Sequence, residues 1–117
     1  MRVLGIDPGS GVTGVGVVEC AGSEVRHLAH GTLRPGSGAA LPARLAMLLR
    51  GLSEVIEQHA PEAVVVEKVF VAASPRSALV LGQARGVALA AAAARSLPVH
   101  EYAASQIKQA VVGHGAA

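Results

Sequence analysis

Two carboxylates in this 117-residue chain stand where short apolar runs end. Asp7, the only aspartate, ends an apolar run that begins at Arg2 and precedes a Pro-Gly turn, and Glu67 follows three valines. A charge directly after a buried strand lies at the rim of its sheet, paired or bound to a cation. If the two strand ends are neighbours, they form a site for a hard divalent cation such as Mg²⁺. Two such ions would support phosphodiester hydrolysis.

Small residues surround the turn after Asp7. Gly9, Gly11 and Gly14 leave the backbone uncrowded, so a phosphate group could approach it closely. Simpler interpretations stay open, because Asp and Pro together initiate turns and a glutamate at a strand end is often only solvated. The functional interpretation depends on the two carboxylates being taken together.

Further residues could contact a nucleic acid. Phe70 falls in a predicted loop three residues after Glu67, where it would stack on bases or wedge between them, or else turn back into the core. The candidate phosphate contacts are four basic side chains: Lys68, Arg76, Arg85 and Lys108. The five histidines show no helical His-x-x-x-His spacing, and we expect them to be structural or on the surface.

The order of the predicted elements is three strands, then helix, strand, helix, strand and helix. Apolar residues recur with helical spacing along residues 41–59, and residues 63–66 form a short, wholly apolar run. The predicted strands span residues 2–7, 12–19, 24–34, 63–66 and 97–102, and the predicted helices span 41–59, 76–96 and 103–112. A strand that follows a helix pairs naturally in parallel, so the order predicts an α/β fold with a mixed sheet.

The composition bounds the class of protein. The chain is 51% hydrophobic and 15% charged, which predicts one ordered domain over residues 1–117. A net charge of +2 permits a nucleic-acid partner without arguing for one. The single cysteine excludes an internal disulfide and fits a cytoplasmic location, and we expect no signal peptide. The most apolar stretch, residues 86–94, is too short to span a membrane.

Five ordered segments resemble the RuvC family of Holliday-junction resolvases. They cover nearly the whole chain, and together they are specific. The segments are Gly5-Ile6-Asp7-Pro8-Gly9-Ser10-x-x-Thr13-Gly14, Glu67-Lys68-Val69-Phe70, Ser77-Ala78-Leu79-x-Leu81-Gly82-Gln83-Ala84-Arg85-Gly86-Val87-Ala88, Pro98-Val99-x-Glu101-Tyr102-Ala103 and Gln106-x-Lys108-Gln109-x-Val111-Val112-Gly113.

The resemblance implies an RNase H-like fold, with a mixed five-stranded sheet and helices on both faces. It implies a symmetric homodimer, formed through the helix that begins near Arg76, which nicks four-way DNA junctions in recombination and repair. The family works with two Mg²⁺ or Mn²⁺ ions on four acidic residues, of which Asp7 and Glu67 match the first two. Phe70 matches an aromatic used on junction bases, and Lys108 matches a basic residue near the scissile phosphate. A junction-branch-migration motor complex is the implied partner.

The resemblance also has a departure. The family chain continues into a final helix with two further aspartates, whereas this sequence ends at Ala117, and we expect it to cleave junctions poorly or not at all. One alternative is therefore a catalytically inactive fragment that still binds junctions. Others are a phosphate-binding lobe of the actin-like ATPase and sugar-kinase class, which would need a second lobe, and the short RuvC-like nucleases of RNA processing. The helical segment from Gly82 to Val87 favours RuvC over the last.

Overall fold

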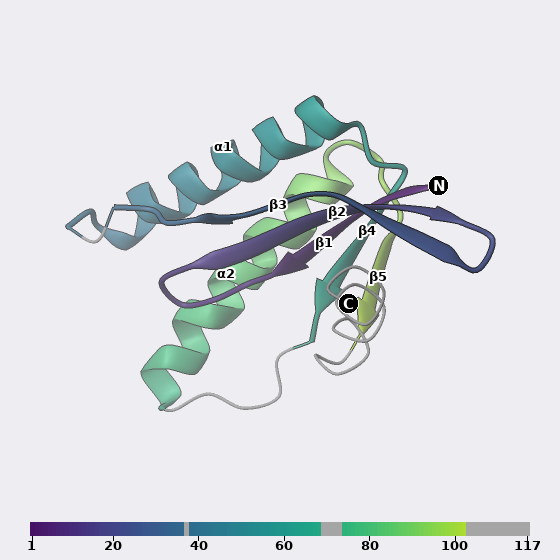
Figure 1. The fold of residues 1–117 in the computed structure, drawn as a ribbon. Coiled ribbons are helices and arrows are strands. Elements are labelled where there is room, and N and C mark those ends of the chain that lie inside the picture. The colour runs from purple at the N-terminus through teal and green to yellow at the C-terminus, as the bar shows by residue number, and fades with distance from the viewer. Residues whose placement is uncertain (37, 69–73, 103–117) are drawn as a thin grey trace.

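A computed structural model describes residues 1–36, 38–68 and 74–102, and it has the predicted order of elements as far as residue 102 (Figure 1). The strands are β1 (Arg2–Asp7), β2 (Thr13–Ala21), β3 (Glu24–Leu33), β4 (Ala63–Glu67) and β5 (Val99–Tyr102). The helices are α1 (Leu41–His59) and α2 (Pro75–Ala93). The helix predicted at residues 103–112 lies outside the described residues. Neither described helix combines the length and apolar character that a membrane span needs.

The five strands form one mixed sheet in the order β3-β2-β1-β4-β5. The first three strands are an antiparallel meander, and β4 pairs in parallel with both β1 and β5. This arrangement confirms the predicted mixed sheet. The parallel pairings follow from the helices that connect β3 to β4 and β4 to β5, because such crossovers return the chain in the same direction.

Side-chain alternation separates the two faces of the sheet. On the core face, Leu4 and Ile6 of β1 and Val64 and Val66 of β4 are buried against both helices. Helix α1 contributes large side chains such as Leu52, whereas α2 packs through buried alanines and so lies close to the sheet. Both described helices cover this core face. The helices on both faces that the resemblance implies are therefore not found among the described residues, and the helix predicted at residues 103–112 lies outside them.

A β-bulge interrupts the pairing of β2 with β3. Val17 pairs with Ala29, but the next residue of β2, Val18, pairs with His27, which leaves Leu28 without a partner across the strand. The extra residue reverses the alternation of β3 at that point. It explains why the sequence of this strand alternates imperfectly.

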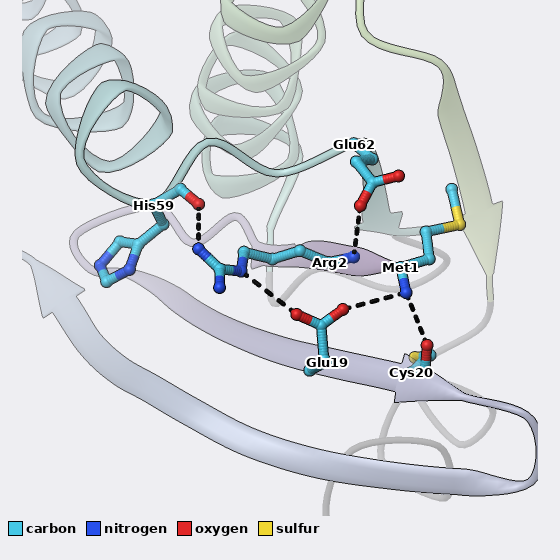
Figure 2. Close-up of polar contacts among 6 residues, drawn as sticks. All are labelled: Met1, Arg2, Glu19, Cys20, His59 and Glu62. Carbon is cyan, nitrogen blue, oxygen red and sulfur yellow. Dashed lines mark hydrogen bonds and ion pairs between the residues drawn. The ribbon is translucent and has the colours of Figure 1, made fainter.

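A network of ion pairs and hydrogen bonds lies at the beginning of β1 (Figure 2). The Glu19 carboxylate on β2 forms ion pairs with the α-ammonium group of Met1 at 2.9 Å and with Nε of Arg2 at 3.6 Å. Arg2 also donates to the carbonyl oxygen of His59 at 2.8 Å, and its backbone N–H donates to Glu62 at 3.2 Å. The network ties β1 to β2 and to the connection from α1 to β4, at the end of β1 farthest from Asp7.

Candidate functional site

Asp7 and Glu67 end two neighbouring parallel strands. Ile6 of β1 is paired with Val66 of β4, so the residue that follows in each strand comes beside its counterpart. Adjacent strands lie about 4.8 Å apart. Both carboxylates belong to the open face, because the preceding residues, Ile6 and Val66, point into the core. The structure thus brings together the two acids that the sequence singled out.

The surroundings of this carboxylate pair suit a hard cation. Asp7 is exposed and Glu67 is half-buried, so a metal ion could reach both. Gly14 pairs with Asp7 across β1 and β2, and a Cβ atom at Gly14 would lie 3.7 Å from that of Asp7. Over the described residues no group of three or more His, Cys, Asp or Glu side chains gathers. Two carboxylates completed by water and phosphate oxygens are a donor set that Mg²⁺ accepts.

The loop that follows Asp7 is held tightly. A Cβ atom at Gly9 would lie 2.1 Å from the carbonyl oxygen of Val12, so no larger residue fits there without a backbone shift. Arg44 of α1 donates a hydrogen bond of 2.9 Å to the carbonyl oxygen of Ser10. The buried Nε of Arg44 has no hydrogen-bond partner among the described residues, and it borders a cavity of about 20 Å³ lined by this loop. That volume holds one water molecule.

Arg44 is not among the site residues predicted from the sequence. The signal that could have found it is a charge inside an apolar stripe, because Arg44 falls between Leu41, Leu45 and Leu48 on the inward side of α1. An arginine at such a position has to reach an acceptor. Here the acceptor belongs to the loop that begins at the candidate catalytic aspartate.

The predicted basic residues lie in different places. Lys68 directly follows Glu67, its side chain is exposed, and its backbone N–H donates to the carbonyl oxygen of Tyr102 at 2.7 Å. Arg76 is exposed in the first turn of α2. Arg85 instead forms an ion pair with Glu101, which pairs with Val66 and so lies on the core face, away from the carboxylate pair. Phe70 and Lys108 lie outside the described residues.

Sequence similarity to known proteins extends over nearly the whole of this chain. A crossover junction endodeoxyribonuclease RuvC of Alkalilimnicola ehrlichii is 58% identical over 116 residues, which are 99% of this chain and 70% of the relative. The protein of the same name from Trichlorobacter lovleyi is 56% identical over 117 residues, which are 100% of this chain and 66% of the relative. The chain therefore spans about two thirds of the length of the relatives that it matches.

A solved structure of a RuvC protein has the same fold as this chain. The structure described as T. thermophilus RuvC in complex with Holliday junction substrate superposes with a TM-score of 0.81 at 33% identity, over 93% of this chain and 68% of that one. The family model described as crossover junction endodeoxyribonuclease RuvC matches residues 3–117. Nucleases of that family are metal-dependent hydrolases. With its RNase H-like fold and its carboxylate pair at the ends of β1 and β4, the chain belongs to the RuvC family of crossover junction endodeoxyribonucleases.

Proposed function

We propose that this chain carries the metal-binding carboxylates of a nuclease that nicks four-way DNA junctions symmetrically in recombination and repair. The observation that carries the proposal is the adjacency of Asp7 and Glu67 on an open sheet face. The junction substrate is supported by the T. thermophilus relative, whose structure is described as a complex with a Holliday junction. The glycine loop after Asp7 leaves room for a DNA backbone to approach.

Asp7 and Glu67 would hold two Mg²⁺ ions, which Mn²⁺ could replace. Bound ions of this kind lower the pKa of a coordinated water and offset charge on the leaving oxygen. The protein itself would position the two ions, because the parallel pairing of β1 with β4 fixes the spacing of the carboxylates that would bind them. Lys68, adjacent to Glu67, would contact a DNA phosphate, and Arg76 is a second candidate contact. Base stacking by Phe70 and a phosphate contact by Lys108 stay predictions.

A symmetric dimer would present two such sites to two equivalent strands. Support comes from the outer side of α2, which carries exposed small or apolar residues spaced three or four apart, with Ala78 beside them: Leu79, Gly82, Gly86, Ala90 and Ala93. Leu79, at 64% exposed, is the most exposed large apolar side chain among the described residues. Small residues along such a helix permit close approach of a second copy. A branch-migration motor as partner and a cytoplasmic location complete the proposal.

Nicking of a synthetic four-way junction in the presence of Mg²⁺ tests the activity, with a linear duplex of the same sequence as substrate control. We expect slow nicking, symmetric and confined to the junction, because two of the family's four acids are not in this sequence, and we expect Asp7→Asn and Glu67→Gln to reduce it by about a hundredfold or more. Glu54→Gln, which changes an exposed acid of α1, should leave the rate unchanged. Nicking that survives in Asp7→Asn would contradict the assignment of the carboxylates.

A gel shift run with the same junction separates the second candidate function. Specific binding without nicking would support a junction-binding chain whose catalysis needs acids beyond the two described here. If the chain neither binds nor nicks the junction, the proposal is overturned.

Sedimentation velocity tests the dimer. Leu79→Glu should convert a dimer to a monomer, because it places a charge on the exposed apolar stripe of α2. Met47→Glu is the matched control, since Met47 is an exposed apolar residue on the other helix, at 42% exposure. A wild-type chain that sediments as a monomer at high concentration would exclude this interface.

A further inference from the structure

Two histidines meet on the surface of β3. Nδ1 of His30 lies 3.0 Å from Nε2 of His27, and the two ring centroids are 4.9 Å apart with planes tilted by 49°. Both residues are exposed. The pair belongs to none of the machinery described above, since neither ring contacts the carboxylate pair or the loop after Asp7.

The β-bulge creates this pair. Residues three apart in a regular strand point to opposite faces, so His27 and His30 would ordinarily be separated by the sheet. With Leu28 left out of the pairing, His27 pairs with Val18 and His30 with Gly16. Val18 and Gly16 are two residues apart on β2 and share a face, so the two histidines share it as well. The pair therefore lacks the helical His-x-x-x-His spacing and depends on the bulge instead.

We propose that His27 and His30 form a chelating site for a borderline divalent transition-metal ion, of the class of Ni²⁺, Cu²⁺ or Zn²⁺. Imidazole nitrogens bind these ions at about 2.0 Å, which sets two nitrogens of one ion about 2.8 Å apart at a right angle and about 3.3 Å apart in a tetrahedron. The observed 3.0 Å lies between these limits. The strand backbone holds both rings on one face of the sheet, so binding requires only that the side chains rotate and exchange the hydrogen bond between the two nitrogens for bonds to the ion.

The chemistry of the site differs from that of Asp7 and Glu67. Imidazole favours borderline ions, whereas carboxylates favour hard ions such as Mg²⁺. No third His, Cys, Asp or Glu joins the pair among the described residues, so water completes the coordination sphere. Exposure of both rings leaves the remaining positions of the ion open to solvent or to an external ligand.

Calorimetric titration of the untagged full chain with Ni²⁺, in excess Mg²⁺ to occupy the carboxylate pair, tests the proposal. We expect one Ni²⁺ per chain, with affinity reduced about tenfold or more in His27→Gln and in His30→Gln. His100→Gln removes another exposed histidine and should leave the affinity within about twofold. Thermal unfolding without metal checks that each variant is folded.

A double variant, Arg26→His with His27→Arg, is the sharper control. It preserves composition and net charge but moves one imidazole to residue 26, which pairs with Glu19 and lies on the other face. Loss of Ni²⁺ binding in this variant supports a chelate built by the bulge. Unchanged binding, or a wild-type chain that binds no Ni²⁺, would overturn the proposal and leave only a hydrogen bond between two imidazoles. Junction nicking does not enter these measurements, so their failure is separate from failure of the proposed nuclease.

Discussion

The guanidinium group of Arg44 donates a 2.9 Å hydrogen bond to the carbonyl oxygen of Ser10, and α1 thereby holds the loop that follows Asp7. Arg44→Met keeps the apolar stem and removes the donor. We expect the free energy of unfolding to fall by about 1 kcal/mol, since the contact is partly solvated. Urea unfolding measures it, with Arg50→Met, an exposed arginine of the same helix, as control.

The same variant should raise the Mg²⁺ concentration needed for half-maximal nicking, because a looser loop positions Asp7 less well. Arg44→Lys restores a donor and should recover part of the effect. An Arg44→Met protein with the stability and Mg²⁺ dependence of the wild type would show that the bond to Ser10 is incidental.

Gly9 and Gly11 provide a matched pair of alanine substitutions. A Cβ atom at Gly9 meets the Val12 carbonyl at 2.1 Å, whereas one at Gly11 meets nothing within 4 Å. Gly9→Ala should therefore destabilise the fold by about 1–3 kcal/mol, and Gly11→Ala should not. Thermal unfolding of both variants decides the matter, and equal melting temperatures would disprove the close approach.

The network around Glu19 predicts how stability depends on pH. A hydrogen bond from the α-ammonium group of Met1 lowers the pKa of Glu19, and the same bond raises the pKa of the Met1 ammonium. The Glu19 contribution is therefore lost as pH falls through its lowered pKa. The Met1 contribution is lost as pH rises through its raised pKa.

Glu19→Gln removes both effects. The stability difference between wild type and Glu19→Gln should be largest near neutral pH and shrink in acid and in alkali, as measured by unfolding at about pH 3, 6.5 and 10. A difference that does not change with pH would argue that the carboxylate contributes only through packing.

An open cavity of about 170 Å³ lies between β3 and α1, lined by residues that include Gly31, Val55 and His59. A Cβ atom at Gly31 would meet nothing within 4 Å. Gly31→Ala should stabilise the protein by about 0.4–1 kcal/mol, because it restricts the unfolded chain without strain in the strand. Gly22→Ala should destabilise it, because Gly22 has φ +61°. Chemical denaturation of both variants tests the opposite signs.

Much of the fold could be predicted from local pattern. The helix at residues 41–59 matches α1 at both ends, since its apolar spacing and Pro61 define it. The second helix was predicted to continue to residue 96 but ends at Ala93. Its alanine-rich sequence carries no stop signal there, and the turn that follows gives Ser96 a positive φ of 57°. The bulge at Leu28 could not be predicted, because it depends on the register in which β3 pairs with the preceding strand, β2, and local composition does not fix that register.

The sequence identified the carboxylate pair of the candidate site, Asp7 and Glu67, but not Arg44, which holds the neighbouring loop. Asp7 and Glu67 were found because each is a charge at the end of an apolar run, and the relatives at 58% identity favour the RuvC family over the actin-like and sugar-kinase alternative. Arg44 was missed although it interrupts the apolar stripe of α1, because its acceptor is a backbone carbonyl 34 residues away that the sequence does not identify. The phosphate contact by Arg85 stays a prediction, and its ion pair with Glu101 could not be predicted from the sequence.

The alternation of inward and outward side chains along β1 and β4 also predicts how substitutions in these strands affect the protein. Residues such as Leu4, Ile6 and Val64 fill the core, while Asp7 and Glu67 face outward from the same two strands. Inheritable changes at the inward positions should therefore lower cellular abundance, whereas changes at the outward acids should silence the chemistry and leave abundance intact. Across a complete library of single substitutions, the two kinds of defect should appear with a period of two residues along each strand.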